Sequence, residues 1–224
     1  MLLLATDTSG KNGSIALARV TPGRSGVEVI EVVPLAGGTF SAQLVPQIAA
    51  LLEKHGYRKT DLAGFAVASG PGSFTGLRVG LAAIKALAEV LHKPIAAISL
   101  LEAVARSGRV HARVFVVLDA GRGEVYAGDY DLEPQFRLRS ERLLSREAFL
   151  VEARGRAVVT PDADLAEALR VAGATVQQIE YPGSGAIARL GWERIQRGET
   201  VRPEDLEANY IRRSDAEIFS KPRP

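Results

Sequence analysis

The sequence predicts an α/β protein built from two similar halves. Apolar stretches of strand length alternate with segments whose apolar residues recur at helical spacing. An apolar strand, an aspartate, a glycine turn and a returning strand occur around Asp7 and again around Asp119. This repeat indicates an internal duplication. We expect one domain over residues 1–100 and a second over residues 101–224.

The first half is expected to open with three strands, over residues 2–6, 14–20 and 27–33, joined by short turns. A helix capped by Thr39 or Ser41 should follow and end near residue 55. Pro46 lies inside the helical pattern, which favours an irregular first turn or a later start.

Residues 63–94 organise the rest of this half. An apolar strand over residues 65–69 breaks where a proline stands between two glycines, and Ser73 or Thr75 can cap a helix that runs to about residue 92. A short strand over residues 95–98 follows, and a capping box at Ser99 opens a short helix.

The second half is expected to mix strands and helices. We expect strands over residues 114–118, 124–131, 157–160 and 174–180, helices from Ser145, Pro161 and Ser184, and a last extended segment over residues 208–213.

The composition is that of an ordinary globular protein, with 46% hydrophobic and 24% charged residues. Cysteine is absent, which excludes disulfides and thiol chemistry. No apolar run approaches the roughly 20 residues of a membrane span, and the start lacks the basic segment of a signal peptide. We expect a soluble cytoplasmic protein. The net charge of +2, without a polybasic run, argues against a chain that binds nucleic acid on its own.

Asp7, Thr8 and Ser9 follow the first strand and precede a glycine turn. Actin-like nucleotide-binding domains present hydroxyls and backbone N–H groups to phosphate from such a turn, but an aspartate that bonds its own turn is an equally good interpretation. After Asp119, no Ser or Thr follows at the distance that a second phosphate loop needs. The nucleotide apparatus is therefore incomplete, and no histidines stand at metal-ligand spacing.

The glycine-rich segment between Gly70 and Gly80 matches neither a P-loop nor a dinucleotide-binding fingerprint. A tight turn, with Gly76 and Gly80 allowing close helix packing, accounts for the glycines. Arg78 lies in the first turn of the expected helix, where a cation is disfavoured by the helix dipole, so we expect it to serve a partner or ligand.

Residues 69–80, with the sequence SGPGSFTGLRVG, resemble the signature of the TsaB (YeaZ) family. Residues 4–9 (LATDTS), 119–126 and 210–212 (YIR) are similar to further segments of that family, in the same order along nearly the whole chain.

The resemblance implies an actin-like (ASKHA, ribonuclease H-like) two-domain α/β fold with a reduced second domain. It implies a non-catalytic accessory subunit that pairs with TsaD, joined by the ATPase TsaE, to form threonylcarbamoyladenosine at position 37 of tRNAs reading codons that begin with A. The isolated chain is expected to form a homodimer and to need no cofactor, with ATP or ADP left open for the complex and tRNA bound through the complex. Asp7, Thr8 and Ser9 would then be a vestigial phosphate loop, and no metal is expected.

The family pairs through the two helices of its first domain, here over residues 41–55 and 73–92. Surplus apolar residues on both helices agree with an interface. The expected interface residues are Leu44, Val45, Ile48, Leu52, Gly70, Gly72, Phe74, Thr75, Gly76, Arg78, Val79, Gly80 and Ala83. Arg212 and Arg213, in the matched late segment, are candidates for contact with RNA.

Two other functions remain open at this point. An autonomous actin-like kinase or ATPase would use Asp7, Ser9 and Asp119, and nucleotide should then stabilise the isolated chain. An independent RNA-binding module would need a contiguous basic surface and would bind tRNA with a steep salt dependence.

Overall fold

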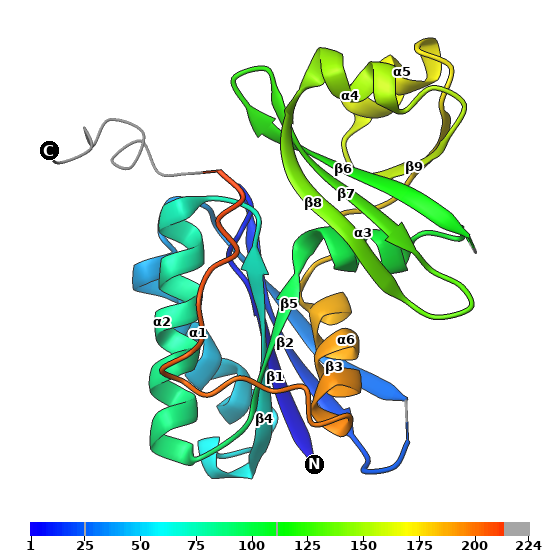
Figure 1. Cartoon of the computed structure of the whole chain (residues 1–224). Helices are drawn as coiled ribbons and strands as arrows, with labels where there is room; N and C mark the ends of the chain where they lie inside the picture. Colours follow the sequence, from blue (N-terminus) through cyan, green and yellow to red (C-terminus); the bar gives the residue numbers. More distant parts are fainter. Residues whose placement is uncertain (25, 111, 213–224) are drawn as a thin grey trace, which may run out of the picture. The chain divides into compact units, whose positions relative to one another are not determined.

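The computed structural model describes residues 1–24, 26–110 and 112–212. They divide into two compact units (Figure 1). Unit 1 comprises Met1–Ala103 and Tyr181–Ala208, and unit 2 comprises Val104–Glu180 and the described residues from Asn209 onward. Residues 181–208, which we expected in the second domain, pack in unit 1 because helix α6 (Ser184–Gln196) covers one face of its sheet.

Unit 1 is built on a five-stranded sheet of order β3-β2-β1-β4-β5. Its first three strands form an antiparallel meander, and β4 and β5 add in parallel on the other side of β1. The strands are β1 (Leu2–Asp7), β2 (Gly13–Val20), β3 (Val27–Leu35), β4 (Leu62–Gly70) and β5 (Ile95–Ser99).

Helices cover both faces of this sheet (Figure 1). Because side chains alternate along a strand, Leu2 and Leu4 of β1 pack under α1 and α2, whereas Leu3 and Ala5 pack against α6. The helices of unit 1 are α1 (Phe40–Lys54), the short 3₁₀ helix η1 (Lys59–Asp61), α2 (Phe74–Leu91), α6 (Ser184–Gln196) and the start of α3 (Leu100–Ser107).

Small side chains let α6 lie close to the sheet. A Cβ atom on Gly191 would come within 2.3 Å of the Cβ of Ala66, so only glycine fits there. Trp192 of the same helix donates a hydrogen bond from Nε1 to the carbonyl oxygen of Arg24, at 3.1 Å. The helix is therefore fixed to the β2–β3 hairpin as well as to the sheet.

Unit 2 repeats the strand order of unit 1, as β10-β9-β6-β7-β8. Again three antiparallel strands are followed by two parallel ones beside the first. Its elements are β6 (Arg113–Gly121), β7 (Glu124–Asp131), β8 (Arg137–Ser145), α4 (Arg146–Glu152), β9 (Ala157–Thr160), α5 (Ala163–Val171) and β10 (Thr175–Gln178).

The shared strand order confirms the duplication. It is the ribonuclease H-like topology of actin-like proteins, and the second copy is reduced, since α4 and α5 have 7 and 9 residues against 15 and 18 for α1 and α2. Among the described residues, none of the helices has the length and apolar character needed to cross a bilayer.

Three local expectations differ from the structure. Helix α1 runs without interruption from Phe40 through Pro46. The N-cap of α6 is Gly183, one residue before the expected Ser184. Residues 208–212 form no strand, and β8 was not expected because its sequence, RLRSERLLS, is rich in arginine and does not alternate cleanly.

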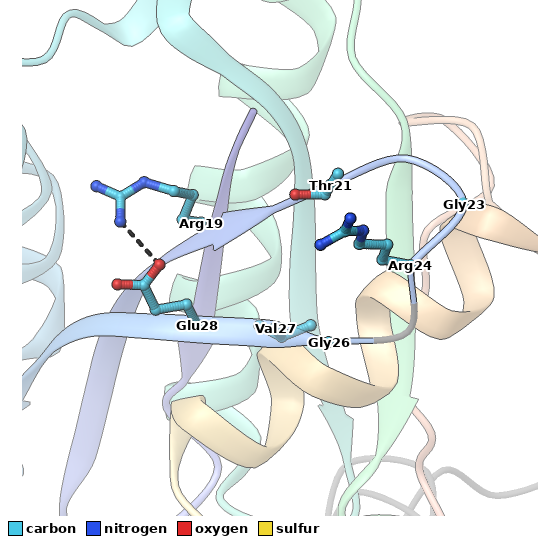
Figure 2. A pocket seen from close by; sticks show the side chains of 7 residues that line it. All are labelled: Arg19, Thr21, Gly23, Arg24, Gly26, Val27 and Glu28. Carbon is cyan, nitrogen blue, oxygen red and sulfur yellow. Dashed lines mark hydrogen bonds and ion pairs between the residues drawn. The ribbon is translucent and has the colours of Figure 1, made fainter.

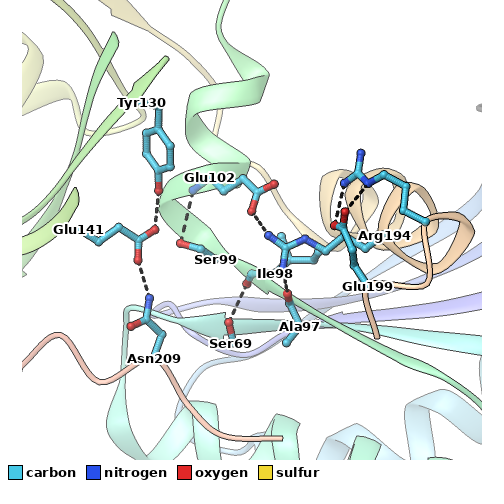
Figure 3. Close-up of polar contacts among 11 residues, drawn as sticks. Ser69, Ala97, Ile98, Ser99, Glu102, Tyr130, Glu141, Arg194, Glu199 and Asn209 are labelled. Carbon is cyan, nitrogen blue, oxygen red and sulfur yellow. Dashed lines mark hydrogen bonds and ion pairs between the residues drawn. The ribbon is translucent and has the colours of Figure 1, made fainter. Parts of the chain in front are cut away.

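Each unit contains a polar connection between distant segments (Figure 3). In unit 1, Arg194 of α6 pairs with the buried carboxylate of Glu102 and donates to the carbonyl of Ala97 at 2.6 Å. In unit 2, Glu141 accepts hydrogen bonds from Tyr130 Oη and Asn209 Nδ2, both at 2.5 Å. The second connection holds the returning chain at Asn209 to β8.

Candidate functional site

The loop after β1 and the start of α2 meet in unit 1. Thr8 donates a hydrogen bond from Oγ1 to the carbonyl oxygen of Gly76, at 2.7 Å. The backbone N–H of Ser73 donates to the carbonyl oxygen of Ser9, also at 2.7 Å. Ser73 is the N-cap of α2, and its hydroxyl accepts from the N–H of Gly76. The two signature segments of the sequence therefore form one structural unit.

Glycine at every fourth position makes this contact possible. A Cβ atom would lie 2.3 Å from the Ser9 carbonyl oxygen at Gly72, 2.1 Å from the Thr8 carbonyl oxygen at Gly76, and 2.3 Å from Thr8 Oγ1 at Gly80. Gly76 and Gly80, four residues apart, lie on one face of α2, and Gly72 lies just before the helix. The glycines of the signature thus serve contact with the β1 loop of the same chain.

Asp7 is held in a closed set of hydrogen bonds. Its side chain is only 1% exposed, and its Oδ1 accepts from Ser9 N at 2.9 Å and from Ser9 Oγ at 2.5 Å. Burial raises the pKa of Asp7, and the bonds from Ser9 offset this only in part. Asp7 therefore bonds its own loop through Ser9.

Tyr181 closes the loop from the other end of the chain. Its hydroxyl lies 3.3 Å from Ser9 Oγ, and a Cβ atom on Gly10 would lie 3.3 Å from that hydroxyl. Tyr181 is 42% exposed as a whole residue, but its hydroxyl end is buried beside Asp7, and both this burial and Asp7 raise the pKa of Tyr181 far above its usual range. The hydroxyl of Tyr181 therefore lies beside the polar groups that a phosphate would have to reach.

The N-terminus of α6 lies beside the same loop. Ser14 stands opposite Asp7 in the β1–β2 register, and its Oγ accepts from the backbone N–H of Ser184 at 2.9 Å. The hydroxyl of Ser184 is buried and has no hydrogen-bond partner among the described residues. This places the positive end of a helix dipole near a buried carboxyl group.

The β6–β7 turn of unit 2 corresponds in position to the loop after β1, but its hydrogen bonds differ. Asp119 is exposed and accepts only a local bond from the N–H of Gly121, at 3.0 Å. Arg122 and Gly123 at the tip both have positive φ, 58° and 76°. Arg212 donates to the carbonyls of Ala120 and Gly121 at 2.9 and 3.3 Å and pairs with Glu124.

The residues predicted as a vestigial phosphate loop, and Arg212 among the candidates for RNA contact, bond to other parts of the chain. Asp7, Thr8 and Ser9 lie together as expected, but their side chains bond to each other and to α2. Arg212, a candidate for RNA, is engaged with the β6–β7 turn, and Arg213 lies outside the described residues. In the part of the chain that the structure describes, no three acidic or histidine side chains gather closely enough to hold a metal ion.

The predicted partner residues separate into two groups. Six of them are buried within unit 1, so the prediction fails for these, because the sequence pattern does not tell a core face from an outer one. The buried group is Leu44, Ile48, Leu52, Gly70, Gly76 and Gly80. The exposed or half-buried group is Val45, Gly72, Phe74, Thr75, Arg78, Val79 and Ala83.

The outer face of α1 is poor in charge, and that of α2 carries Arg78, Lys85 and Glu89 among apolar side chains. Val45 is 56% exposed and Val90 69% exposed, and α1 carries no charged residue before Glu53. At the start of α2, the Arg78 guanidinium lies 3.7 Å from the centre of the Phe74 ring, so it covers an apolar ring of its own helix. Alanines 42, 49, 82 and 86 complete this exposed face.

Several hollows lie away from this loop. One, of about 660 Å³, follows the β2–β3 hairpin between Arg19 and Glu28, which form an ion pair at 2.8 Å (Figure 2). Another, of about 350 Å³, lies in unit 2 at Arg113 and Arg156. Neither includes Asp7.

Sequence reasoning missed Tyr181 and the arginine pair of unit 2. Tyr181 lies 172 residues from Ser9, and no local pattern joins them. Arg113 begins β6 and Arg156 directly precedes β9, and the parallel pairing of these two strands brings the arginines together.

The family model described as TsaD, tRNA N6-adenosine threonylcarbamoyltransferase, matches residues 32–147, slightly more than half of the chain. The TsaB protein of Bacillus subtilis is 37% identical over 131 residues, and that of Escherichia coli is 30% identical over 133; each alignment covers 58% of this chain and 55% of the relative. The chain thus spans about half the length of the curated relatives it matches.

A solved structure of YeaZ from Pseudomonas aeruginosa is similar over almost its whole length. It aligns with a TM-score of 0.73 and 26% identity, covering 93% of this chain and 99% of that one. A second Pseudomonas aeruginosa structure, described as similar to peptidase YeaZ, has the same TM-score and 28% identity. On its sequence signature, its duplicated fold and these similarities, the chain belongs to the TsaB (YeaZ) family.

Proposed function

We propose that this chain is a non-catalytic accessory subunit in the formation of threonylcarbamoyladenosine in tRNA. Its relatives are named for the biosynthesis of that nucleoside, and the matching family model is named for the threonylcarbamoyltransferase. The partner would be a TsaD-type transferase, with TsaE joining the pair and tRNA bound by the assembly. We expect the complex to work in the cytoplasm.

The outer face of α1 and α2 carries this proposal. Val45, Phe74 and Val90 are exposed apolar side chains on two neighbouring helices, and the small residues between them allow another backbone to approach. An exposed apolar patch with few charges is typical of a protein interface. The same face would form a homodimer when the transferase is absent.

The closed loop at Asp7 supports a non-catalytic role. An actin-like ATPase would need Asp7 and the nearby hydroxyls free for water, metal and phosphate, but here Asp7 bonds Ser9 and Thr8 bonds α2. We therefore expect no cofactor on the isolated chain, and any ATP or ADP would act at the level of the complex. ATP with Mg²⁺ should not change the melting temperature of the chain alone.

Val45→Arg tests the proposed interface without touching the core. The matched control is Val171→Arg on α5, where the side chain is 81% exposed and lies in unit 2. Sedimentation of each variant with the cognate transferase should show a heterodimer for the wild type and the control. Val45→Arg should weaken association at least tenfold, because the interface would have to bury an unpaired charge.

The reconstituted reaction provides the second readout. With threonylcarbamoyl-adenylate and tRNA, we expect no product from the chain alone, product from the wild-type pair, and a strong loss with Val45→Arg. Product formed by the chain alone, or undiminished association of Val45→Arg, would contradict the proposal.

A further inference from the structure

The hollow of about 350 Å³ in unit 2 is lined by Arg113, Phe115, Gly155, Arg156 and Ala157. It lies at the amino ends of β6 and β9, which pair in parallel with Phe115 opposite Val158. Because Asp119 and the β6–β7 turn are at the carboxyl end of β6, the hollow is separate from the phosphate-loop position of this unit.

Arg113 is fixed in the hollow by a two-pronged ion pair. Its Nε and Nη2 donate to the two carboxylate oxygens of Asp129, at 2.9 and 2.6 Å. Asp129 is buried, so this geometry is held firmly. The remaining nitrogen, Nη1, takes no part in these bonds, and the guanidinium lies 6.0 Å from the centre of the Phe115 ring.

Arg156 lies over the same ring but has no acidic partner. Its guanidinium is 4.7 Å from the ring centre of Phe115. Within residues 1–24, 26–110 and 112–212, no carboxylate forms an ion pair with it. Stacking on the aromatic ring orients the planar group while its N–H donors stay available. The hollow therefore presents two guanidinium groups, of which only that of Arg113 forms an ion pair in the described residues; the nearby carboxylates of Asp131 and Glu152 pair with Arg139 and Arg142.

The turn before β9 adds a further arginine near the hollow. Arg154 and Arg156 flank Gly155, which has a φ of 67°, and the side chain of Arg154 is exposed. By contrast, the hollow at the β2–β3 hairpin has its Arg19 neutralised by Glu28 (Figure 2). The unit 2 hollow thus combines the guanidinium of Arg156, which forms no ion pair in the described residues, and the remaining Nη1 donor of Arg113 with a concave surface.

We propose that this hollow binds a phosphodiester group of RNA, with Arg156 and the free Nη1 of Arg113 as donors. The planar fork of arginine matches phosphate oxygens, and the open face of the Arg156 guanidinium can stack on a base next to the bound phosphate. The choice of RNA over a free nucleotide or an acidic peptide rests on the proposed function, in which the assembly acts on tRNA.

Arg156→Glu and its neutral isostere Arg156→Gln test the site. The control is Arg170→Glu on α5, which makes the same change in charge at an exposed residue paired only with Glu167. Binding of an unmodified tRNA transcript should be measured by fluorescence anisotropy between about 50 and 200 mM salt. Both the full-length chain and its complex with the transferase should be used.

Arg156→Gln should bind the transcript about tenfold more weakly, as expected for loss of one charge-assisted contact to phosphate. The slope of log affinity against log salt should become shallower by about one. Arg170→Glu should bind like the wild type. Circular dichroism melts should show that all variants remain folded.

Equal weakening by Arg156→Glu and Arg170→Glu would indicate only general charge attraction and overturn the proposal. The proposal would also be overturned if Arg156→Gln bound the transcript with wild-type affinity, or if neither the chain nor the complex bound tRNA. Binding of AMP or of a polyglutamate peptide that depends on Arg156, without binding of tRNA, would overturn it as well. Assembly with the transferase is read separately by sedimentation. Failure of the α1–α2 interface is therefore distinguished from failure of this site.

Discussion

A Cβ atom on Gly80 would lie only 2.3 Å from Thr8 Oγ1, so the β1 loop occupies the space that a side chain at residue 80 would need. Real Cβ atoms essentially never approach another atom this closely. Since Thr8 Oγ1 is also bonded to the Gly76 carbonyl, the hydroxyl has no easy way to move aside. Substitutions at Gly80 therefore test the core of unit 1.

Gly80→Ala should lower the free energy of unfolding by about 2 kcal/mol, because overpacking outweighs the gain in helix propensity of about 1 kcal/mol. Urea unfolding measures this change. Gly185→Ala on α6 is the matched control, since its Cβ would meet its nearest neighbour only at 3.7 Å and should cost nothing. In a Thr8→Ala background the Gly80→Ala penalty should shrink by about 1 kcal/mol, and strict additivity would contradict the contact.

Asp7→Asn should stabilise the protein at neutral pH. Burial raises the pKa of Asp7 in the folded state, so the unfolded chain releases this proton at lower pH than the folded one. The contribution of Asp7 to stability is therefore full below its unfolded pKa and is lost as pH rises through the folded pKa. Asparagine does not titrate, and its side-chain oxygen can still accept from Ser9.

Urea unfolding from pH 4 to pH 8 should show the advantage of Asp7→Asn growing with pH. As control, Asp205→Asn changes an exposed carboxylate paired with Arg202 and should leave the profile of the wild type almost unchanged. An advantage that falls as pH rises would reverse the expected sign and contradict a raised pKa of the buried Asp7.

Glu102→Ala should destabilise unit 1 by about 3 kcal/mol, since it leaves Arg194 without its buried carboxylate partner. Glu199→Ala breaks an exposed pair with Arg197 and should change stability by less than about 0.5 kcal/mol. Thermal or urea unfolding compares the two. Similar small effects would mean that Arg194 finds other partners when Glu102 is removed.

Arg212→Lys distinguishes a structural role from a role in RNA binding. A lysine keeps the charge but cannot bond two carbonyls and Glu124 at once. We expect faster amide hydrogen exchange at residues 121–124, with tRNA affinity within about twofold of the wild type. Unchanged exchange together with a large loss of tRNA affinity would assign Arg212 to RNA instead.

Local sequence signals predicted most of the fold. Alternating apolar runs and glycine turns located nine of the ten strands, and Ser73 and Ser145 act as N-caps as expected. The missed strand, β8, is partly exposed and rich in arginine, so it lacks the alternation on which such prediction depends. For the contact between the β1 loop and α2, local patterns predicted only that Gly76 and Gly80 would allow another element to pack closely.

The rest of the site depends on long-range placement. Tyr181 reaches Ser9 because α6 returns to unit 1, and no pattern near residue 181 indicates that return. Likewise, helical spacing shows which residues share a face but not which face is buried, so Leu52 was assigned to an interface although it packs in the core. Burial is a property of the assembled unit.

The path of the chain through unit 1 also bears on its biosynthesis. Residues 104–180 leave the ribosome before α6, so all the described strands of unit 2 are synthesised while one face of the first sheet is still uncovered. That uncovered face includes Ala5, Ala16 and Ala66, which are buried only when Trp192 and its neighbours in α6 pack against them. Neither unit is therefore completed in the order of translation, and a nascent chain stalled before residue 184 would expose an apolar sheet to chaperones.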